Sequence, residues 1–297
     1  MSARIGAYVL PGDPVWFRSS LARYYPVIDE LVVLVPEDGR GWTGLPIPVA
    51  ACLEIVEEID LRRISRQVRG RWTDQANPMR ADTAQRQAGL DALAGRVDWV
   101  LQIDNDEVLP DVEAVLRTVE ELPSDVVGVE WPMRVLYRHL RGHSWAAVTG
   151  AGGEPVVEYP GCVVVRPTAR LVDARRPGEA SIQRMVVVGD VTSLQVRQPP
   201  VEGEIRVEGL PPEQAIWHNS WGRSPAEIWR KTRTWGHAAG VKGVAYFLLR
   251  WLPSKWLWRR SRDFHPFAQG LWPALRPVTI PSDLLDDRDL PQTKRFA

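Results

Sequence analysis

The stretch DWVLQIDNDEVLP, residues 98–110, decides the fold of this chain. Its mainly apolar run from Trp99 to Ile103 predicts a buried strand, and four polar residues follow at once, three of them acidic. In an open α/β fold, ligands meet the sheet at the ends of such strands. Asp104 and Asp106 repel each other unless a cation lies beside them. Hard oxygen ligands suit Mg²⁺ or Mn²⁺, so the stretch predicts a metal-dependent enzyme acting on a nucleotide-diphosphate substrate.

Hydrophobic runs on both sides of this stretch alternate between strand and helix patterns. Continuous aliphatic runs that end at Pro or Gly are typical of buried strands, and apolar residues three or four apart are typical of helices. The order strand, helix, strand predicts an α/β fold with a mainly parallel sheet flanked by helices. We expect strands at 5–10, 31–35, within 46–59, at 99–103 and at 126–131, and helices at 17–25, at 82–93 with Ala84, Ala88 and Leu93 inward, and from 110 onward.

The pattern changes after Trp131. Short β-type pieces (156–159, 162–165, 185–188 and 205–207) alternate with Gly and Pro, which predicts an antiparallel insertion with long loops. Ser224 to Glu227 has the form of a capping box with Pro at the first helical position, so a helical region should begin there. We therefore predict a domain at 1–222, with a nucleotide-binding half at about 1–110 and an acceptor half at about 111–222, and a helical extension and tail at 223–297.

The composition argues against several classes of protein. Lys+Arg and Asp+Glu are both 37, so net charge predicts no general attraction to nucleic acid. The two cysteines, Cys52 and Cys162, form no CxxC pair, which argues against a zinc site or a disulfide framework. The first residues lack a signal-peptide pattern, and no apolar run reaches the roughly 18 residues that span a bilayer. We expect a cytoplasmic protein.

Two polar side chains outside the acidic stretch are candidates for its site. Arg86 lies on the helix that precedes the acidic strand and could clamp phosphate with its planar guanidinium. Alternatively, it is an exposed arginine paired with Asp82, four residues earlier. His218, between Trp217 and Trp221, could supply an imidazole ligand to a metal. The alternative is a histidine packed between the two Trp rings.

Residues 223–263 are strongly basic and rich in Trp. Ten Lys or Arg oppose only Glu227 and Asp263, a net charge of +8 from 10 − 2. A basic helix with Trp and Leu suits a membrane surface, where rings lie at the headgroups and cations meet anionic lipid. The alternative is an amphipathic helix packed on the protein's own core with solvated basic residues. Nucleic acid is disfavoured, since no binding module is visible.

Together these residues resemble the family-two glycosyltransferases, which have the GT-A fold. The resemblance is clearest in ADTAQRQAGLDALAGRVDWVLQIDNDEVLP, residues 81–110, which is similar to the family's helix, strand and metal motif. The segment IWHNSWGRSPAEIWRKTRTWGHA, residues 216–238, is similar to the family's late His and the Lys-bearing helix that follows it. The resemblance covers roughly residues 4–240.

This resemblance implies transfer of a sugar, a hexosyltransferase-type reaction, from a nucleotide diphosphate, most often UDP. It implies Mn²⁺ or Mg²⁺ at Asp104 and Asp106, with His218 as a further ligand. The residues that it implies for nucleotide-sugar binding are Pro11, Glu37, Asp38, Arg86, Asp104 and Asn105.

The catalytic base is the least determined part of this comparison. Inverting members of the family use a carboxylate to take the acceptor's proton, and in many relatives it lies shortly before a strand in the variable half. This chain has Gln183 in that place. Glu179 and Asp190, with Asp173, are nearby candidates, and the sequence does not choose between them.

The sequence thus predicts an inverting, metal-dependent glycosyltransferase with a sugar or lipid-linked acceptor. Residues 223–263 suggest peripheral contact with the inner membrane face. A nucleotidyltransferase that forms a sugar nucleotide is disfavoured, because the loop after the first strand, LPGDP at 10–14, is not a Gly-rich loop with Arg. A non-catalytic sugar-nucleotide-binding scaffold stays open because of Gln183. Asp106→Ala is expected to abolish turnover with little effect on folding.

Overall fold

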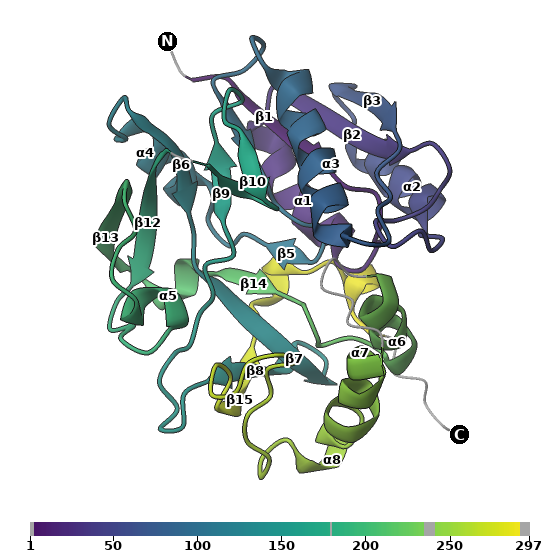
Figure 1. Ribbon diagram of the computed structural model, residues 1–297, viewed down its shortest axis with the longest axis vertical. Coiled ribbons are helices and arrows are strands. Elements are labelled where there is room, and N and C mark those ends of the chain that lie inside the picture. Colours follow the sequence, from purple (N-terminus) through teal and green to yellow (C-terminus); the bar gives the residue numbers. More distant parts are fainter. Residues whose placement is uncertain (1–2, 179, 235–240, 292–297) are drawn as a thin grey trace.

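The long apolar runs of the chain form one large sheet in the computed structural model, which describes residues 3–178, 180–234 and 241–291. Its strand order is β13-β12-β6-β9-β4-β1-β2-β3, and β9 runs antiparallel to its neighbours β4 and β6 while the other neighbours are parallel (Figure 1). The strands are β1 (Ile5–Val9), β2 (Glu30–Pro36), β3 (Ser65–Gly70), β4 (Trp99–Leu101), β6 (Val126–Glu130), β9 (Cys162–Val165), β12 (Ser181–Val187) and β13 (Glu204–Leu210). This is the predicted α/β class.

Alternating residues of the central strands fill two apolar layers, one on each face of the sheet. Ala7 and Val33 pack with α1, α2 and α4, whereas Tyr8 and Val32 pack with α3 on the other face. At Gly89 an added Cβ would lie 2.7 Å from the Tyr8 ring, so glycine there lets α3 approach β1 closely. The helices are α1 (Phe17–Tyr24), the 3₁₀ turn Tyr25–Val27, α2 (Val49–Ile59), α3 (Pro78–Leu93), α4 (Val112–Glu120) and α5 (Leu194–Arg197); β10 (Leu171–Asp173) and β11 (Arg176–Pro177) form a hairpin.

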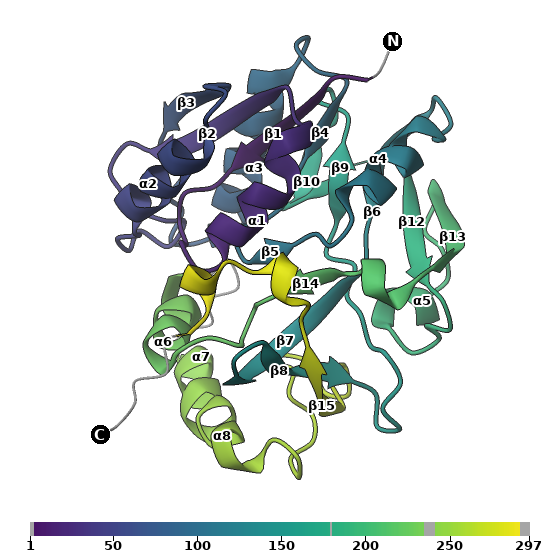
Figure 2. The ribbon, with the colours of Figure 1, turned by 180° about the vertical axis from the view of Figure 1, so that it is seen from behind.

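A second sheet, β15-β8-β7-β14-β5, lies below the first in Figure 1 and is covered by the C-terminal helices. Its strands come from distant parts of the chain, so residues on both sides of position 222 complete it, as the reverse view in Figure 2 also shows. Its strands are β5 (Glu107–Val108), β7 (Met133–Arg141), β8 (Ser144–Thr149), β14 (Ile216–His218) and β15 (Ala274–Thr279). The helices of this part are α6 (Pro225–Thr234), α7 (Val241–Tyr246), the π-helical segment Phe247–Trp251 and α8 (Ser254–Leu257). Its 3₁₀ turns are Pro212–Gln214, Ser282–Leu284 and Asp287–Asp289.

The acidic stretch joins the two sheets. Strand β4 ends at Leu101 in the first sheet, and β5 begins at Glu107 in the second. Strand β14 pairs with β5 in a register that sets His218 opposite Glu107. Sheet pairing therefore places the predicted His beside the acidic residues, although more than a hundred positions separate them in the chain.

Several predicted elements are confirmed. The strands at 5–10, 31–35, 99–103 and 126–131 and the helices at 17–25 and from 110 are present with small shifts of their ends. The capping box is also formed: the Ser224 amide donates to Glu227 Oε2 at 2.8 Å, and the Glu227 amide to Ser224 Oγ at 3.3 Å.

Other predictions are wrong. Residues 49–59 form helix α2 instead of a strand, because Cys52, Ile55 and Val56 are buried at helical spacing, and the third strand is β3. The helix predicted at 82–93 is confirmed as α3, which begins earlier, at Pro78 after the Asn77 cap, and Leu93 is buried as predicted. Ala84 is instead exposed, since Gln85 and Arg86 occupy the buried face.

The predicted antiparallel insertion is corrected in two places. Strand β12 pairs in parallel with both β6 and β13, so it extends the main sheet. Residues 156–159 form no named strand, although Glu158 makes an isolated bridge with Met133.

Candidate active site

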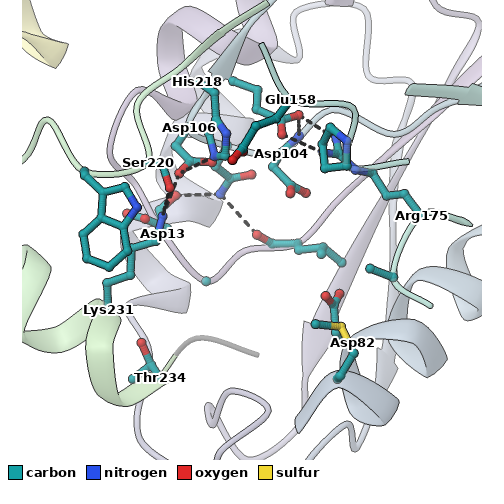
Figure 3. A pocket seen from close by; sticks show the side chains of 18 of the residues that line it. Asp13, Asp82, Asp104, Asp106, Glu158, Arg175, His218, Ser220, Lys231 and Thr234 are labelled. Carbon is teal, nitrogen blue, oxygen red and sulfur yellow. Dashed lines mark hydrogen bonds and ion pairs between the residues drawn. The ribbon is translucent and has the colours of Figure 1, made fainter. Parts of the chain in front are cut away.

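A pocket of about 640 Å³ opens where the strands β1 and β4 end. The loop after β1, the acidic turn, the end of β14 and helix α6 all contribute side chains to its wall (Figure 3). This is the edge at which ligands bind in open α/β sheets. The polar residues that line it are Asp13, Asp82, Gln85, Arg86, Asp104, Asn105, Asp106, Glu107, Glu158, Arg175, Arg176, Gln195, His218, Ser220, Arg223, Glu227, Arg230, Lys231, Thr234 and His265.

Asp106 is the centre of a cluster of cations. Arg223 contacts its carboxylate, Lys231 Nζ lies 3.4 Å from Asp106 Oδ2, and His218 Nε2 lies 3.6 Å from the same oxygen. Burial alone would raise the pKa of Asp106, but Lys231, Arg223 and His218 outweigh it and hold that pKa well below its usual range. In return the Asp106 carboxylate overcomes burial and raises the pKa of His218. Asp106 is thus an anion at neutral pH, whereas burial and Arg223 lower the pKa of Lys231 against the attraction of Asp106.

Asp104 is bound by a single guanidinium. Arg86 reaches both of its oxygens, with NH1–Oδ1 at 2.9 Å and NH2–Oδ2 at 3.1 Å, and its Nε lies 2.6 Å from Asp82. The predicted pairing of Arg86 with Asp82 is confirmed, but the pair is buried instead of exposed. Arg86 therefore lies in the pocket wall, shared between two carboxylates.

Glu107 and Asn105 order the acidic turn from within. Glu107 is fully buried and forms two hydrogen bonds with Arg175, at 2.7 and 2.8 Å, and it accepts one from the Asp104 amide at 3.0 Å. Asn105 Nδ2 donates to the carbonyls of Leu10 and Asp13 at 3.1 and 2.6 Å. These contacts join the acidic turn to the loop after β1.

We expect Glu107→Gln to destabilise the protein by about 2 kcal/mol, because hydrogen bonds to a charged partner are worth roughly 1.5–3 kcal/mol. The change replaces one of the two carboxylate oxygens that hold the buried Arg175 guanidinium. Urea unfolding of the variant and the parent chain would measure the difference. Glu208→Gln, at an exposed position of β13, is the matched control and should leave stability unchanged.

Glu158 is a half-buried carboxylate in the pocket wall that the sequence did not reveal. Its backbone is fixed by two hydrogen bonds with Met133, both 2.9 Å, and Trp272 Nε1 donates to its Oε1 at 2.9 Å. Burial raises the pKa of Glu158, against the opposing charges of His218 and Lys231. A carboxylate held in place with a raised pKa is the state expected of a general base.

The structure brings together most of the predicted site residues. Pro11, Arg86, Asp104, Asn105, Asp106 and His218 all line the pocket. Glu37 and Asp38 do not: Glu37 pairs with Arg71, and Asp38 accepts a hydrogen bond from the Arg40 amide within its own turn.

Asp190, one of the two carboxylates predicted as the catalytic base, does not line the pocket. Asp190 is buried and accepts hydrogen bonds from the Tyr159 hydroxyl at 3.1 Å and the Ser193 amide at 3.0 Å, so it orders a loop. Glu179 lies outside the described residues. Gln183 and Asp173 do not line the pocket either.

Arg223 and Lys231 are the functional candidates that the sequence assigned elsewhere. Both belong to the basic region proposed for a membrane, but they line the pocket, Arg223 from just before α6 and Lys231 from its last turn. The sequence feature that could have identified Lys231 was helical spacing. Lys231 follows Glu227 by one turn of the helix that the capping box begins. Asp13, which Arg223 also contacts, follows the first strand as a strand-end carboxylate.

A metal ion could be bound at the predicted site either by protein ligands alone or together with substrate phosphates, and the residues fit only the second mode. Among the described residues no group of three His, Cys, Asp or Glu gathers to hold an ion, and Asp106 is shared by Arg223 and Lys231. A resident ion held by protein ligands alone does not fit this charge arrangement. An Mg²⁺ that arrives with substrate phosphates needs only one or two carboxylates, and Asp104 and Asp106 fit that mode.

Comparisons with known proteins identify no family. No protein-family model matches the chain, and no curated protein matches it. One similar solved structure, 4-diphosphocytidyl-2C-methyl-D-erythritol synthase from Anaerococcus prevotii, is 16% identical with a TM-score of 0.29; the match covers 53% of this chain and 63% of that one.

Two further solved structures also have low sequence identity and low TM-scores to this chain. Another 4-diphosphocytidyl-2C-methyl-D-erythritol synthase is 14% identical with a TM-score of 0.34, over 56% of this chain and 76% of that one. Mannose-1-phosphate geranyltransferase from Thermus thermophilus is 11% identical with a TM-score of 0.25, over 57% and 51%. These proteins are named as enzymes, but the likeness is too low to carry a functional argument, so function is argued from the pocket alone.

Proposed function

We propose that this chain is an inverting glycosyltransferase that moves a sugar from a nucleotide diphosphate to a hydroxyl acceptor. One observation carries the proposal. Two carboxylates at a strand end, Asp104 and Asp106, form ion pairs in one pocket with Arg86, Arg223 and Lys231. Three cations in a pocket can bind the oxygens of a diphosphate, and carboxylates at a strand end can bind the ion that accompanies it.

Substrate binding would exchange the partners of these charges. Asp13, Asp82, Asp104 and Asp106 balance Arg86, Arg223 and Lys231 to within one formal charge, 4 − 3. A divalent ion alone finds its carboxylates neutralised, and a diphosphate alone finds its cations neutralised. When both arrive, the carboxylates turn to the ion and the cations turn to the phosphates, so the two ligands should bind cooperatively.

The nucleotide base has a ring to stack on in this arrangement. Trp42 lines the pocket, and its Nε1 donates to Gln85 Oε1 at 2.7 Å. Gln85 is itself anchored, since its Nε2 donates to the Leu34 carbonyl at 2.9 Å. Any nucleotide base can stack on an aromatic ring, and this stacking contributes about 1–3 kcal/mol per base. A UDP-linked donor is our proposal, in keeping with the family resemblance.

The chemistry would divide between Glu158 and the cations of the pocket. Glu158 takes the proton of the acceptor hydroxyl, whose oxygen attacks the anomeric carbon from the face opposite the diphosphate. The bond from that carbon to the phosphate oxygen breaks, its electron pair stays on the diphosphate, and the configuration inverts. Arg223 and Lys231 stabilise the charge as it develops. A bound Mg²⁺ or Mn²⁺, held by Asp104 and Asp106, would supply further neutralisation of that charge.

Thermal-shift measurements with Mn²⁺, UDP and both together test the proposed exchange of partners. We expect the joint shift to exceed the sum of the two single shifts by an amount equivalent to about 1–3 kcal/mol of coupling. In Arg223→Gln, which removes a cation from Asp106, Mn²⁺ alone should give a larger shift than in the parent chain. Strictly additive shifts in both proteins would contradict the exchange.

Turnover separates the proposed activity from its alternatives. A glycosyltransferase incubated with Mn²⁺ and UDP-sugars should release UDP slowly to water and faster with an acceptor. A nucleotidyltransferase should instead release pyrophosphate from a nucleoside triphosphate and a sugar phosphate. A non-catalytic scaffold should bind the sugar nucleotide and release neither product.

A further inference from the structure

The basic region 223–263 divides into two parts with different surroundings. Arg223, Arg230 and Lys231 line the pocket, and the first and last of them contact Asp106. The basic residues after position 241 face solvent: they are Lys242, Arg250, Lys255, Arg259, Arg260 and Arg262. Six cations oppose only Asp263 within 241–263, so this second part keeps a net charge of +5 from 6 − 1.

The same part of the chain has one buried face. Tyr246, Phe247, Trp251 and Trp258 recur at helical spacing and pack on β7 and β8. The Tyr246 hydroxyl donates to Tyr137 Oη at 2.8 Å, among other contacts that fix the helices. The protein's own core therefore uses this face completely, as the packing alternative of the sequence analysis predicts.

The other face carries large apolar side chains that the core does not use. Leu248 is 50% exposed, Leu249 75%, Trp256 75% and Leu257 48%. They lie on the π-helical segment and α8, at the lower end of the molecule in Figure 1. Four large apolar side chains among six exposed cations are more than a solvated helix face requires, and such patches mark interaction sites.

We propose that this face, the apolar residues 248, 249, 256 and 257 with the six exposed cations of the same segment, is a peripheral docking surface for an anionic lipid bilayer. The apolar side chains would enter the boundary between headgroups and acyl chains, and the cations would meet lipid phosphates. Trp256 has the amphipathic ring that is enriched at that depth. No helix among the described residues is long and apolar enough to cross a membrane, so the contact would be interfacial.

The positive charge of this face favours an anionic lipid surface over a protein partner. The cores of protein interfaces are depleted in charged residues, whereas here cations alternate with the apolar side chains along the chain. Each Lys or Arg near an anionic surface contributes about 1 kcal/mol, and this attraction falls with added salt.

Flotation of the full chain with vesicles tests the proposal. We expect the protein to float with phosphatidylcholine vesicles that contain phosphatidylglycerol, to float poorly with phosphatidylcholine alone, and to be released by salt. Protein that stays in the soluble fraction with both vesicles would overturn the proposal and leave a protein partner as the explanation of the patch.

A pair of leucine variants locates the contact. Leu249→Glu places a charge in the face, and it should lower binding to the anionic vesicles roughly 10- to 100-fold, because burial of one leucine is worth about 1.5–3 kcal/mol. Leu61→Glu, at a leucine that is 84% exposed after α2, is the matched control and should bind as the parent chain does. Equal binding by all three proteins would overturn the assignment of this face.

The two proposals fail separately. Both leucine positions lie outside the pocket wall, so both variants should retain the thermal shift with UDP and Mn²⁺. Loss of flotation with an intact shift supports the docking surface, and an absent shift in the parent chain contradicts only the proposed transfer.

Discussion

Replacing Glu158 with glutamine is expected to lower the rate of sugar transfer by about 10²- to 10⁴-fold, the usual contribution of a general base. Glutamine fills the same space and can still accept the hydrogen bond from Trp272, so folding and donor binding should persist. The measurement is the transfer rate at saturating donor and acceptor, with the UDP thermal shift as the test of binding.

The pH dependence of transfer gives a second readout of the same residue. Burial raises the pKa of Glu158, so its carboxylate becomes protonated, and useless as a base, at a higher pH than an exposed glutamate would. The rate should therefore fall as the pH decreases through this raised pKa, and the residual rate of Glu158→Gln should lack that decrease.

Glu154→Gln is the matched control for Glu158→Gln. Glu154 is exposed in the same loop, four positions earlier, and does not line the pocket. We expect it to transfer sugar at the parent rate. If Glu158→Gln also transfers at that rate, another group takes the acceptor's proton.

Local patterns in the sequence were sufficient to predict the strands at 31–35 and 99–103. The runs at 31–35 and 99–103 are long, apolar and followed by polar turns, and each became a buried strand. The strand predicted within 46–59 was wrong because helix α2, with only Cys52, Ile55 and Val56 buried, also contains valine and isoleucine, which suit strands.

The second sheet could not be predicted, because its pairing depends on contacts between distant parts of the chain. Strand β14 is three residues long and lies between β7 and β5, and β15 returns from the C-terminal region to pair with β8. No short-range pattern encodes such pairings.

The candidate site divides in the same way. Asp104 and Asp106 stand out because they follow a strand, and His218 because it lies just before a capped helix. Glu158 follows no strand or motif, and only the fold brings it to the pocket. Arg223 and Lys231 were hidden within a larger excess of positive charge, where composition cannot tell a pocket-facing cation from a solvated one.

Asp106→Ala should both lower turnover strongly and destabilise the protein, which revises the expectation of a loss of turnover with little effect on folding. The carboxylate is 12% exposed, and it is shared by Arg223 and Lys231. Its removal takes a carboxylate away from the buried Arg223 guanidinium and from Lys231, whose Nζ also lies 3.1 Å from Ser220 Oγ. Breaking a buried ion pair by removing one partner costs about 3–5 kcal/mol.

The functional loss would have a separate cause. Without Asp106 the divalent ion loses a ligand, and a missing stabiliser of developing charge usually costs about 10²- to 10³-fold in rate. Urea unfolding measures the first effect, and UDP release with Mn²⁺ measures the second at a temperature where the variant is folded.

Asp38→Ala is the control that distinguishes the pocket from the wider set of predicted nucleotide residues. Asp38 lies in a turn outside the pocket wall, so its removal should change neither stability nor turnover appreciably. An Asp106→Ala protein with the parent's stability would show that the cations around this carboxylate are solvated in solution. Parental turnover in that variant would remove Asp106 from the site.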